Sequence, residues 1–275
     1  MISKNVIGIC LLSVALSIIS CHDGHKEEPG TKTPAIKEEN ITYTADGVTM
    51  NGFVVYDSSN TDKRPAVLVV HEWWGFNDYS KRRAKELADL GYIAMAVDLY
   101  GDGKTADNPD SALKLAMPLY MNTTMAKTRF DAALTKLKTY TQADPAKIAA
   151  IGYCFGGAMV LNMAKLGDDL AGVVSFHGNL NVAPANKELL KAKILVCHGA
   201  DDPLVSQAEV DLFKKQMDSI GAVYTFKAYP GAKHAFTNPN ATALGEKFKI
   251  PIAYNAAADT ASWKDMKEFF GTIFK

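Results

Sequence analysis

The chain has 275 residues, of which 48% are hydrophobic and 22% charged, the balance of a folded globular protein. This composition excludes a disordered, collagenous or coiled-coil chain. Lys and Arg together number 30 and so do Asp and Glu, so no basic excess points to nucleic acid as a partner. The only long apolar run lies at the N-terminus, which excludes a membrane protein with several spans.

The first 20 residues have the organisation of an export signal. Lys4 precedes an uncharged, mostly aliphatic stretch that is too short to span a bilayer comfortably. This stretch ends in Ile18-Ile19-Ser20-Cys21, which resembles the cleavage motif of bacterial lipoproteins, with lipidation of Cys21. An ordinary secretory peptide is the alternative. We therefore expect an exported protein on the periplasmic or cell-surface side, attached to the membrane through its N-terminal lipid only.

Residues 21–40 are predicted to be a flexible tether. They are rich in charged residues, and Ile36 is their only large aliphatic side chain. Such a segment buries too little apolar surface to offset its ordering entropy. We place one folded domain at residues 41–275, because no internal repeat and no second boundary is evident after residue 41.

From residue 41 onward, short apolar stretches alternate with amphipathic stretches of helical period. Asp46-Gly47 lies between two alternating segments and predicts a β-hairpin. The predicted strands are residues 41–43, 52–56, 66–70, 92–97, 148–151, 171–176, 194–196 and 223–228. The predicted helices are residues 78–90, 111–120, 125–139, a segment from the 152–157 turn to 165, 206–220 and 262–274.

This alternation predicts an α/β fold, with a mostly parallel sheet of about eight strands and helices on both faces. Ligand sites in such sheets lie beyond the carboxyl ends of the strands. We therefore look for chemistry in the residues that directly follow each predicted strand.

A cysteine follows the strand at 148–151, in Gly152-Tyr-Cys154-Phe-Gly156-Gly157. This is the G-x-nucleophile-x-G turn with Cys in the position of Ser. A turn from strand to helix is so tight that residues two before and two after the nucleophile need to lack a Cβ. The helix N-terminus behind it offers backbone N–H groups to an anion. A small residue at a packed turn is the structural alternative.

An acid and a base follow the next strands in the chain. Asp201 and Asp202 come after the strand at 194–196, and His234 comes after the strand at 223–228. Ser206 can cap the following helix, so the Asp pair is free for another role. Nucleophile, acid and base thus occur in the chain order of a hydrolase triad. A thiol, an orienting carboxylate and an imidazole are what acyl transfer requires.

His71-Glu72-Trp73-Trp74-Gly75 follows the strand at 66–70. The loop after this strand supplies one oxyanion donor in hydrolases of this type, so we assign the hole to the backbone N–H groups of Trp73 and Phe155. Glu72, at a strand end beside two tryptophans, is a candidate for a carboxyl that acts near the thiol. Its structural alternative is a hydrogen-bond acceptor.

These motifs, together with Asp98-Leu-Tyr100, Gly199-x-x-Asp202 and His234-x-Phe236, resemble the dienelactone hydrolase family, α/β-hydrolases with a Cys nucleophile. The resemblance covers about residues 40–274. It implies an α/β-hydrolase fold, a Cys154–His234–Asp202 triad and an ester, lactone or thioester substrate. It also implies that Glu72 contacts the resting thiol and helps to form the thiolate when substrate arrives.

The sequence departs from the family at two arginines that hold the substrate carboxylate of true dienelactone hydrolases. One position falls in Gly101-Asp102-Gly103, and the other is Asn238. An acid and an amide do not bind a carboxylate as two arginines do. We therefore expect an apolar or ring-stacking pocket that includes Trp74, Tyr100 and Phe236.

Two alternatives of other classes remain open at this stage. The chain could be a non-catalytic ligand-binding lipoprotein on a hydrolase fold, although a binding module has no need of a full triad. Cys154 and Cys197 could form a disulfide or redox pair. We expect no metal and no cofactor, because neither a metal-ligand spacing nor a glycine-rich phosphate loop is present.

Overall fold

The computed structural model describes Met1 and residues 34–275. The predicted export signal, Cys21 and most of the predicted tether lie outside the described residues and stay predictions. None of the helices in the described part is long and apolar enough to cross a membrane.

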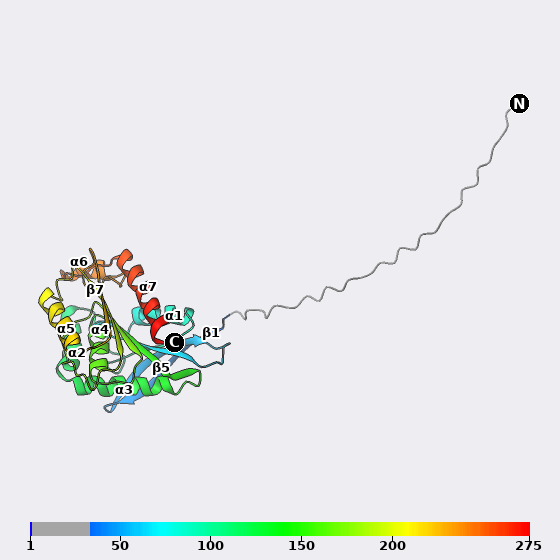
Figure 1. Cartoon of the computed structure of the whole chain (residues 1–275), viewed down its shortest axis with the longest axis horizontal. Coiled ribbons are helices and arrows are strands. Elements are labelled where there is room, and N and C mark those ends of the chain that lie inside the picture. Colours follow the sequence, from blue (N-terminus) through cyan, green and yellow to red (C-terminus); the bar gives the residue numbers. More distant parts are fainter. Residues whose placement is uncertain (2–33) are drawn as a thin grey trace. The chain divides into compact units, whose positions relative to one another are not determined.

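An eight-stranded sheet runs through the unit Pro34–Lys275, in the order β1-β2-β4-β3-β5-β6-β7-β8 (Figure 1). The first two strands form the predicted antiparallel hairpin, and β2 also pairs antiparallel with β4. The other neighbours pair in parallel, which confirms the predicted α/β sheet. The strands are β1 (Ile36–Ala45), β2 (Val48–Asp57), β3 (Arg64–Val70), β4 (Ile93–Val97), β5 (Ala143–Tyr153), β6 (Gly172–Phe176), β7 (Lys193–Gly199) and β8 (Tyr224–Tyr229).

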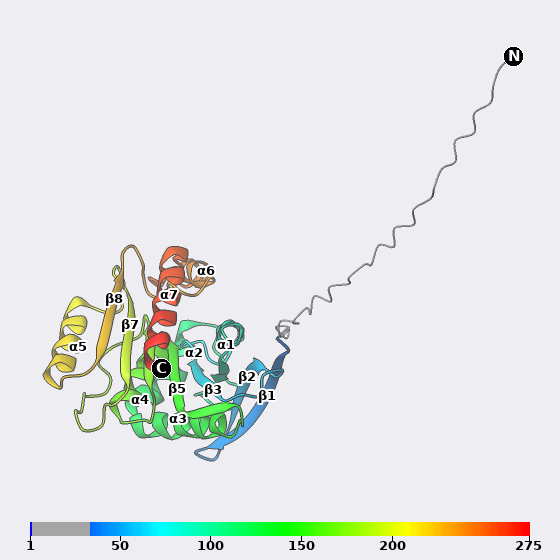
Figure 2. The ribbon, with the colours of Figure 1, turned by 45° about the vertical axis from the view of Figure 1, so that its right-hand side comes forward.

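Helices cover both faces of this sheet (Figure 2). The side chains of β3 alternate, so that Leu68 and Val70 pack with α2 to α5 while Val67 and Val69 pack with α1 and α7. An uninterrupted apolar strand is thus explained by burial on two sides. The helices are α1 (Asp78–Asp89), α2 (Pro109–Met121), α3 (Thr123–Lys138), α4 (Phe155–Lys165), α5 (Gln207–Ser219), α6 (Ala241–Phe248) and α7 (Ala256–Ile273).

Side chains before the helices fix where several of them begin. Asn77 caps α1, Asn108 caps α2 and Asn255 caps α7, each by accepting a backbone N–H of the first turn. Ser206 caps α5 as predicted, by accepting the N–H of Glu209. Asp201 and Asp202 are therefore not needed as caps.

The structure differs from the prediction at the start of the domain. Strand β1 begins at Ile36, so residues 36–40 belong to the sheet and not to the tether. They are polar because β1 is an edge strand, where charged side chains are usual. Glu39 holds the strand in place by accepting hydrogen bonds from Tyr56, at 2.9 Å, and Tyr140, at 3.1 Å. Helix α6 was not predicted at all.

Candidate active site

The candidate site lies where the strand order reverses. Strand β3 leads to β4 on one side, whereas β5 pairs with β3 on the other. Loops that leave the carboxyl ends of two such strands diverge and leave a crevice between them. Here the loop after β3 carries Glu72 and Trp73, and the turn after β5 carries Cys154.

Cys154 sits between β5 and α4 with a φ of 53°, a left-handed conformation that is strained for a non-glycine residue. The two glycines around it make this turn feasible. A Cβ on Gly152 would lie 2.1 Å from the Gly156 carbonyl oxygen, and a Cβ on Gly156 would lie 2.4 Å from that of Val70. The close approach presents the Cys154 side chain at the edge of the sheet.

His234 and Asp202 are joined by a hydrogen bond. The Nδ1 of His234 lies 2.9 Å from Oδ2 of Asp202, and both side chains are buried. The second oxygen of Asp202 accepts the N–H of Leu204 at 2.8 Å, which fixes the carboxylate. Asp201 is exposed. Burial lowers the pKa of His234, but the nearby Cys154 and Asp202 outweigh it and raise that pKa well above its usual value.

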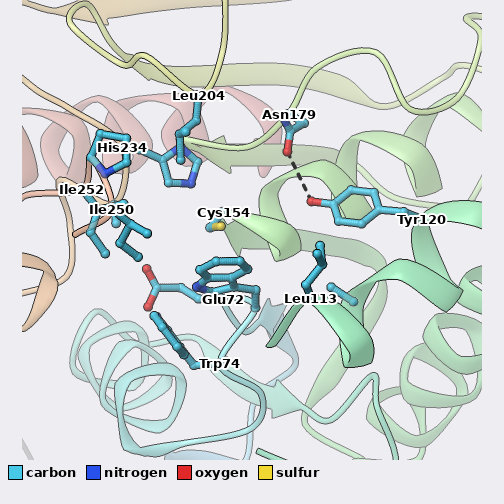
Figure 3. Close-up of a pocket in the computed structure, with 14 residues that line it drawn as sticks. Glu72, Trp74, Leu113, Tyr120, Cys154, Asn179, Leu204, His234, Ile250 and Ile252 are labelled. Carbon is cyan, nitrogen blue, oxygen red and sulfur yellow. Dashed lines mark hydrogen bonds between the residues drawn. The ribbon is translucent and has the colours of Figure 1, made fainter. Parts of the chain in front are cut away.

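A cavity of about 300 Å³ brings Cys154, His234 and Glu72 together (Figure 3). Its walls are otherwise mostly apolar. None of the described residues that line it is an arginine or a lysine. The other lining residues are Trp73, Trp74, Leu113, Ala116, Tyr120, Asn179, Leu204, Ala235, Ile250, Pro251 and Ile252.

Glu72 is a buried carboxyl in the wall of this cavity, and only 2% of its surface is exposed. Asn238 donates its Nδ2 to Oε2 of Glu72 at 2.5 Å. Burial raises the pKa of Glu72 to about 7, against the lowering effect of Asn238, His234 and Arg83. The side-chain amide of Asn238, at the position where the resemblance predicts an arginine, is therefore engaged with Glu72.

The backbone N–H groups of Phe155 and Trp73 have no backbone acceptor within the described part of the chain, and the same holds for those of Trp74 and Gly156 beside them. The N–H of Cys154, in contrast, is occupied by the Phe176 carbonyl at 3.0 Å and by Nδ1 of His177 at 3.1 Å. The N–H groups of Phe155 and Trp73 are thus compatible with the predicted oxyanion hole, which stays a prediction.

Two predicted pocket residues lie elsewhere. Tyr100 is buried against His71 and Phe155, and its hydroxyl donates to the carbonyl of Trp73. Phe236 is buried against the ring of His177. Neither lines the cavity, so the aromatic residues after these strand ends support the loops and do not form the wall. Trp74 does line it, as predicted.

Several wall residues were missed in the sequence because they come from segments without a motif. Leu113 and Tyr120 lie on α2, Leu204 lies before α5, and Ile250 lies after α6. His177 was also missed, although it follows β6 at the carboxyl end of the sheet. The search of residues that follow each predicted strand, which identified His234, identifies His177 equally well.

Cys197 and Cys154 are both free thiols, which excludes the disulfide alternative. Cys197 is buried in β7, where it lies 3.5 Å from the Tyr229 hydroxyl. Burial raises the pKa of its thiol to about 12, even though the Tyr229 hydrogen bond lowers it. A neutral buried thiol is inert packing.

The sheet order, the flanking helices and the turn around Cys154 define an α/β-hydrolase. Residues 50–274 match the model of the dienelactone hydrolase family, and the chain belongs to this family. Hydrolysis of ester or lactone bonds is accordingly its class of reaction.

Known proteins resemble the chain over most of its length. Protein usf of Aquifex pyrophilus is 30% identical over 222 residues, which cover 78% of this chain and 94% of that protein. The crystal structure of a dienelactone hydrolase-like promiscuous phosphotriesterase from metagenomic libraries matches with a TM-score of 0.82 and 33% identity, covering 88% of this chain and all of that one. An esterase of Thermogutta terrifontis, at 16% identity and a TM-score of 0.59, shares the fold.

Proposed function

We propose that this protein hydrolyses uncharged carboxylic esters, lactones or thioesters through a Cys154–His234–Asp202 triad and an acyl-enzyme intermediate. The observation that carries the proposal is the hydrogen bond of 2.9 Å between Asp202 and His234, on an imidazole that lines the same cavity as Cys154. A carboxylate that orients a histidine beside a thiol is the arrangement that nucleophilic acyl transfer needs.

The first half of the reaction forms a thioester on the enzyme. The Cys154 sulfur attacks the carbonyl carbon as a thiolate, and its proton resides on His234. The oxyanion that forms accepts hydrogen bonds from the backbone N–H groups of Phe155 and Trp73. The intermediate then collapses, and His234 returns the proton to the leaving oxygen or sulfur.

The second half releases the acid. His234 takes a proton from a water molecule, whose oxygen attacks the thioester carbonyl. The carboxylic acid leaves as Cys154 is regenerated. Asp202 holds the imidazole through Nδ1, so that Nε2 faces the cavity in both halves.

The apolar wall supports an uncharged substrate. Neither family arginine is present, and Asn238 is bound to Glu72. Glu72 itself would repel a carboxylate once ionised. The dienelactone is a carboxylate, so we do not propose it as the substrate.

The test compares wild type, Cys154→Ala and Cys197→Ala with short-chain aryl esters, following hydrolysis and the intact mass of the protein. Cys154→Ala should lose the acyl adduct and at least about 10⁴-fold in kcat. Cys197→Ala is the matched control and should keep both, because Cys197 lies inside the sheet. A wild type that binds esters without acylation or turnover would instead establish the ligand-binding alternative.

A further inference from the structure

A second hollow adjoins the catalytic cavity. Its volume is about 620 Å³, and it is lined by residues of α2, of α5 and of the loop after β6. Met117, Val182 and Leu212 provide its apolar wall, while Tyr120 and Asn179 line both the hollow and the cavity. The two spaces are therefore neighbours across these two side chains.

The side chains of Tyr120 and Asn179 form the boundary between the two spaces. The hydroxyl of Tyr120 donates to Oδ1 of Asn179 at 3.3 Å, a long bond between neutral groups (Figure 3). Both groups are side chains, so rotation about their χ angles can part them without moving the backbone. A ligand that extends past Cys154 on this side thus meets the hydrogen-bonded side chains of Tyr120 and Asn179, and it can pass if these two side chains rotate apart.

The lining of the hollow combines apolar side chains with the polar side chains of Asn179, Asn181 and Glu209. Met117 and Leu212 of the hollow are 40% and 46% exposed, and Leu113 of the neighbouring catalytic cavity is 50% exposed, which is unusual for clustered large apolar side chains. Leu113 and Met117 are four residues apart and share one face of α2. The charged residue of the hollow is Glu209, whose Oε1 accepts the N–H of Leu180 at 2.7 Å. These features fit an uncharged apolar group and disfavour an anion.

The position of His234 tells which part of the substrate points toward the hollow. The histidine protonates the leaving group, so the leaving group lies on its side of Cys154. That lobe of the cavity is formed by Ala235 and by Ile252, which is bridged to His234. The acyl group is left with the opposite lobe, which is lined by Leu113 and Tyr120 and leads to the hollow.

We propose that the acyl part of the substrate is a long uncharged alkyl chain, which passes Tyr120 and Asn179 and lies in the hollow between α2 and α5. The inference rests on the proposed hydrolase function and adds the substrate class to it. Contacts with Met117, Val182 and Leu212 then determine which acyl-chain lengths the enzyme prefers.

The test measures kcat/KM of the full chain for p-nitrophenyl esters from acetate to octanoate. Each added methylene should raise kcat/KM by up to about fourfold, as for the transfer of a CH₂ group from water to an apolar site. Leu212→Asp should lower the octanoate-to-acetate ratio at least about tenfold, and Met117→Asp is the second variant should the first fail to fold. Val223→Asp is the matched control, because Val223 precedes β8 at the opposite end of the sheet.

The outcomes separate the inference from the function on which it rests. Acetate hydrolysis with a flat or falling length series overturns the alkyl-chain inference and leaves the hydrolase standing. The same follows if both aspartate variants fold and keep the wild-type ratio. A wild type that hydrolyses no ester overturns both. A rising series that collapses in Leu212→Asp and survives in Val223→Asp supports the inference.

Discussion

Glu72 is buried at the end of β3 and shares its cavity with Cys154 and His234. Its pKa of about 7 means that the carboxyl exchanges its proton near neutral pH. A carboxyl in this state can stay neutral beside a thiol or become an anion when its surroundings change. The sequence indicated the position through its place at a strand end, directly before two tryptophans, but did not indicate the contact with Asn238.

Glu72→Gln should change the pH dependence of stability. The folded-state pKa of about 7 exceeds the ordinary value of 4.5, so the folded protein binds more protons between these values. Stability from this group is complete below about 4.5 and is lost as pH rises through about 7, a difference of about 3 kcal/mol. The variant lacks this loss. Urea unfolding at pH 5 and pH 8 measures it.

The quantity compared is the difference between the wild-type and variant free energies of unfolding at each pH, in which the contributions of groups distant from Glu72 cancel. An unchanged pH slope in Glu72→Gln would contradict the assignment. The same variant tests the role in catalysis: we expect slower acylation by aryl esters in a protein that remains folded. An acylation rate equal to that of wild type would remove Glu72 from the mechanism.

Helix α4 approaches the end of β3 very closely at Gly156. A Cβ on Gly156 would lie 2.4 Å from the Val70 carbonyl and 2.6 Å from that of His71, both backbone atoms. This contact sets the spacing between the turn that carries Phe155 and the loop that carries Trp73. The glycine pattern was visible in the sequence, whereas its partner on another strand was not.

Gly156→Ala should therefore destabilise the fold by about 3 kcal/mol, because backbone has to move to admit the methyl group. Activity should fall further, since α4 carries one of the two proposed oxyanion donors. Gly271→Ala is the matched control: nothing lies within 4 Å of a Cβ there, in α7. It should stabilise by about 0.5 to 1 kcal/mol. Thermal unfolding of both variants measures these changes in stability. A Gly156→Ala variant as stable as wild type would show that the backbone contact at Gly156 is loose.

Elements with strong patterns were predicted well, and weakly patterned ones were not. The buried strands β3, β4, β6 and β7 and the capped helices α1 and α5 follow from apolar runs and cap residues, whereas β5 begins at Ala143, five residues before the predicted start. Helix α6 has only eight residues, no side-chain cap at Asn240 and a non-glycine left-handed end at Lys249. It packs in a small apolar cluster with Ala235 and Ile252, contacts that the residues of the helix do not indicate by themselves.

At the scale of the molecule, the folded unit is longer than the sequence indicated, because its edge strand begins at Ile36. This strand is held in the sheet by antiparallel pairing with β2, from Ile36 opposite Asp57 to Ala45 opposite Val48. Its polar composition resembles that of a linker. The sequence of an exposed edge strand therefore cannot be distinguished from a tether until its partner is known.

A chain that starts at Pro34 should be more stable than one that starts at Ile41. The shorter chain loses half of the β1–β2 ladder and the two hydrogen bonds to Glu39. We expect a loss of about 2 kcal/mol, at about 1 kcal/mol for each such side-chain bond. Urea midpoints of the two chains measure it. Equal midpoints would mean that residues 36–40 add nothing to the fold.

The proposed catalytic residues and the side chains proposed to contact the acyl chain belong to different parts of the chain. Cys154 and Asp202 follow β5 and β7, whose side chains are mostly buried and leave little tolerance for change, whereas His234 follows the edge strand β8 and is itself buried. Leu113, Met117 and Leu212 are exposed on two outer helices. Substitutions on those helices carry little cost in folding. Hydrolases that descend from one ancestor can thus differ in the acyl chain they prefer while they keep the same catalytic residues. Variant libraries confined to exposed positions of α2 and α5 would test this directly.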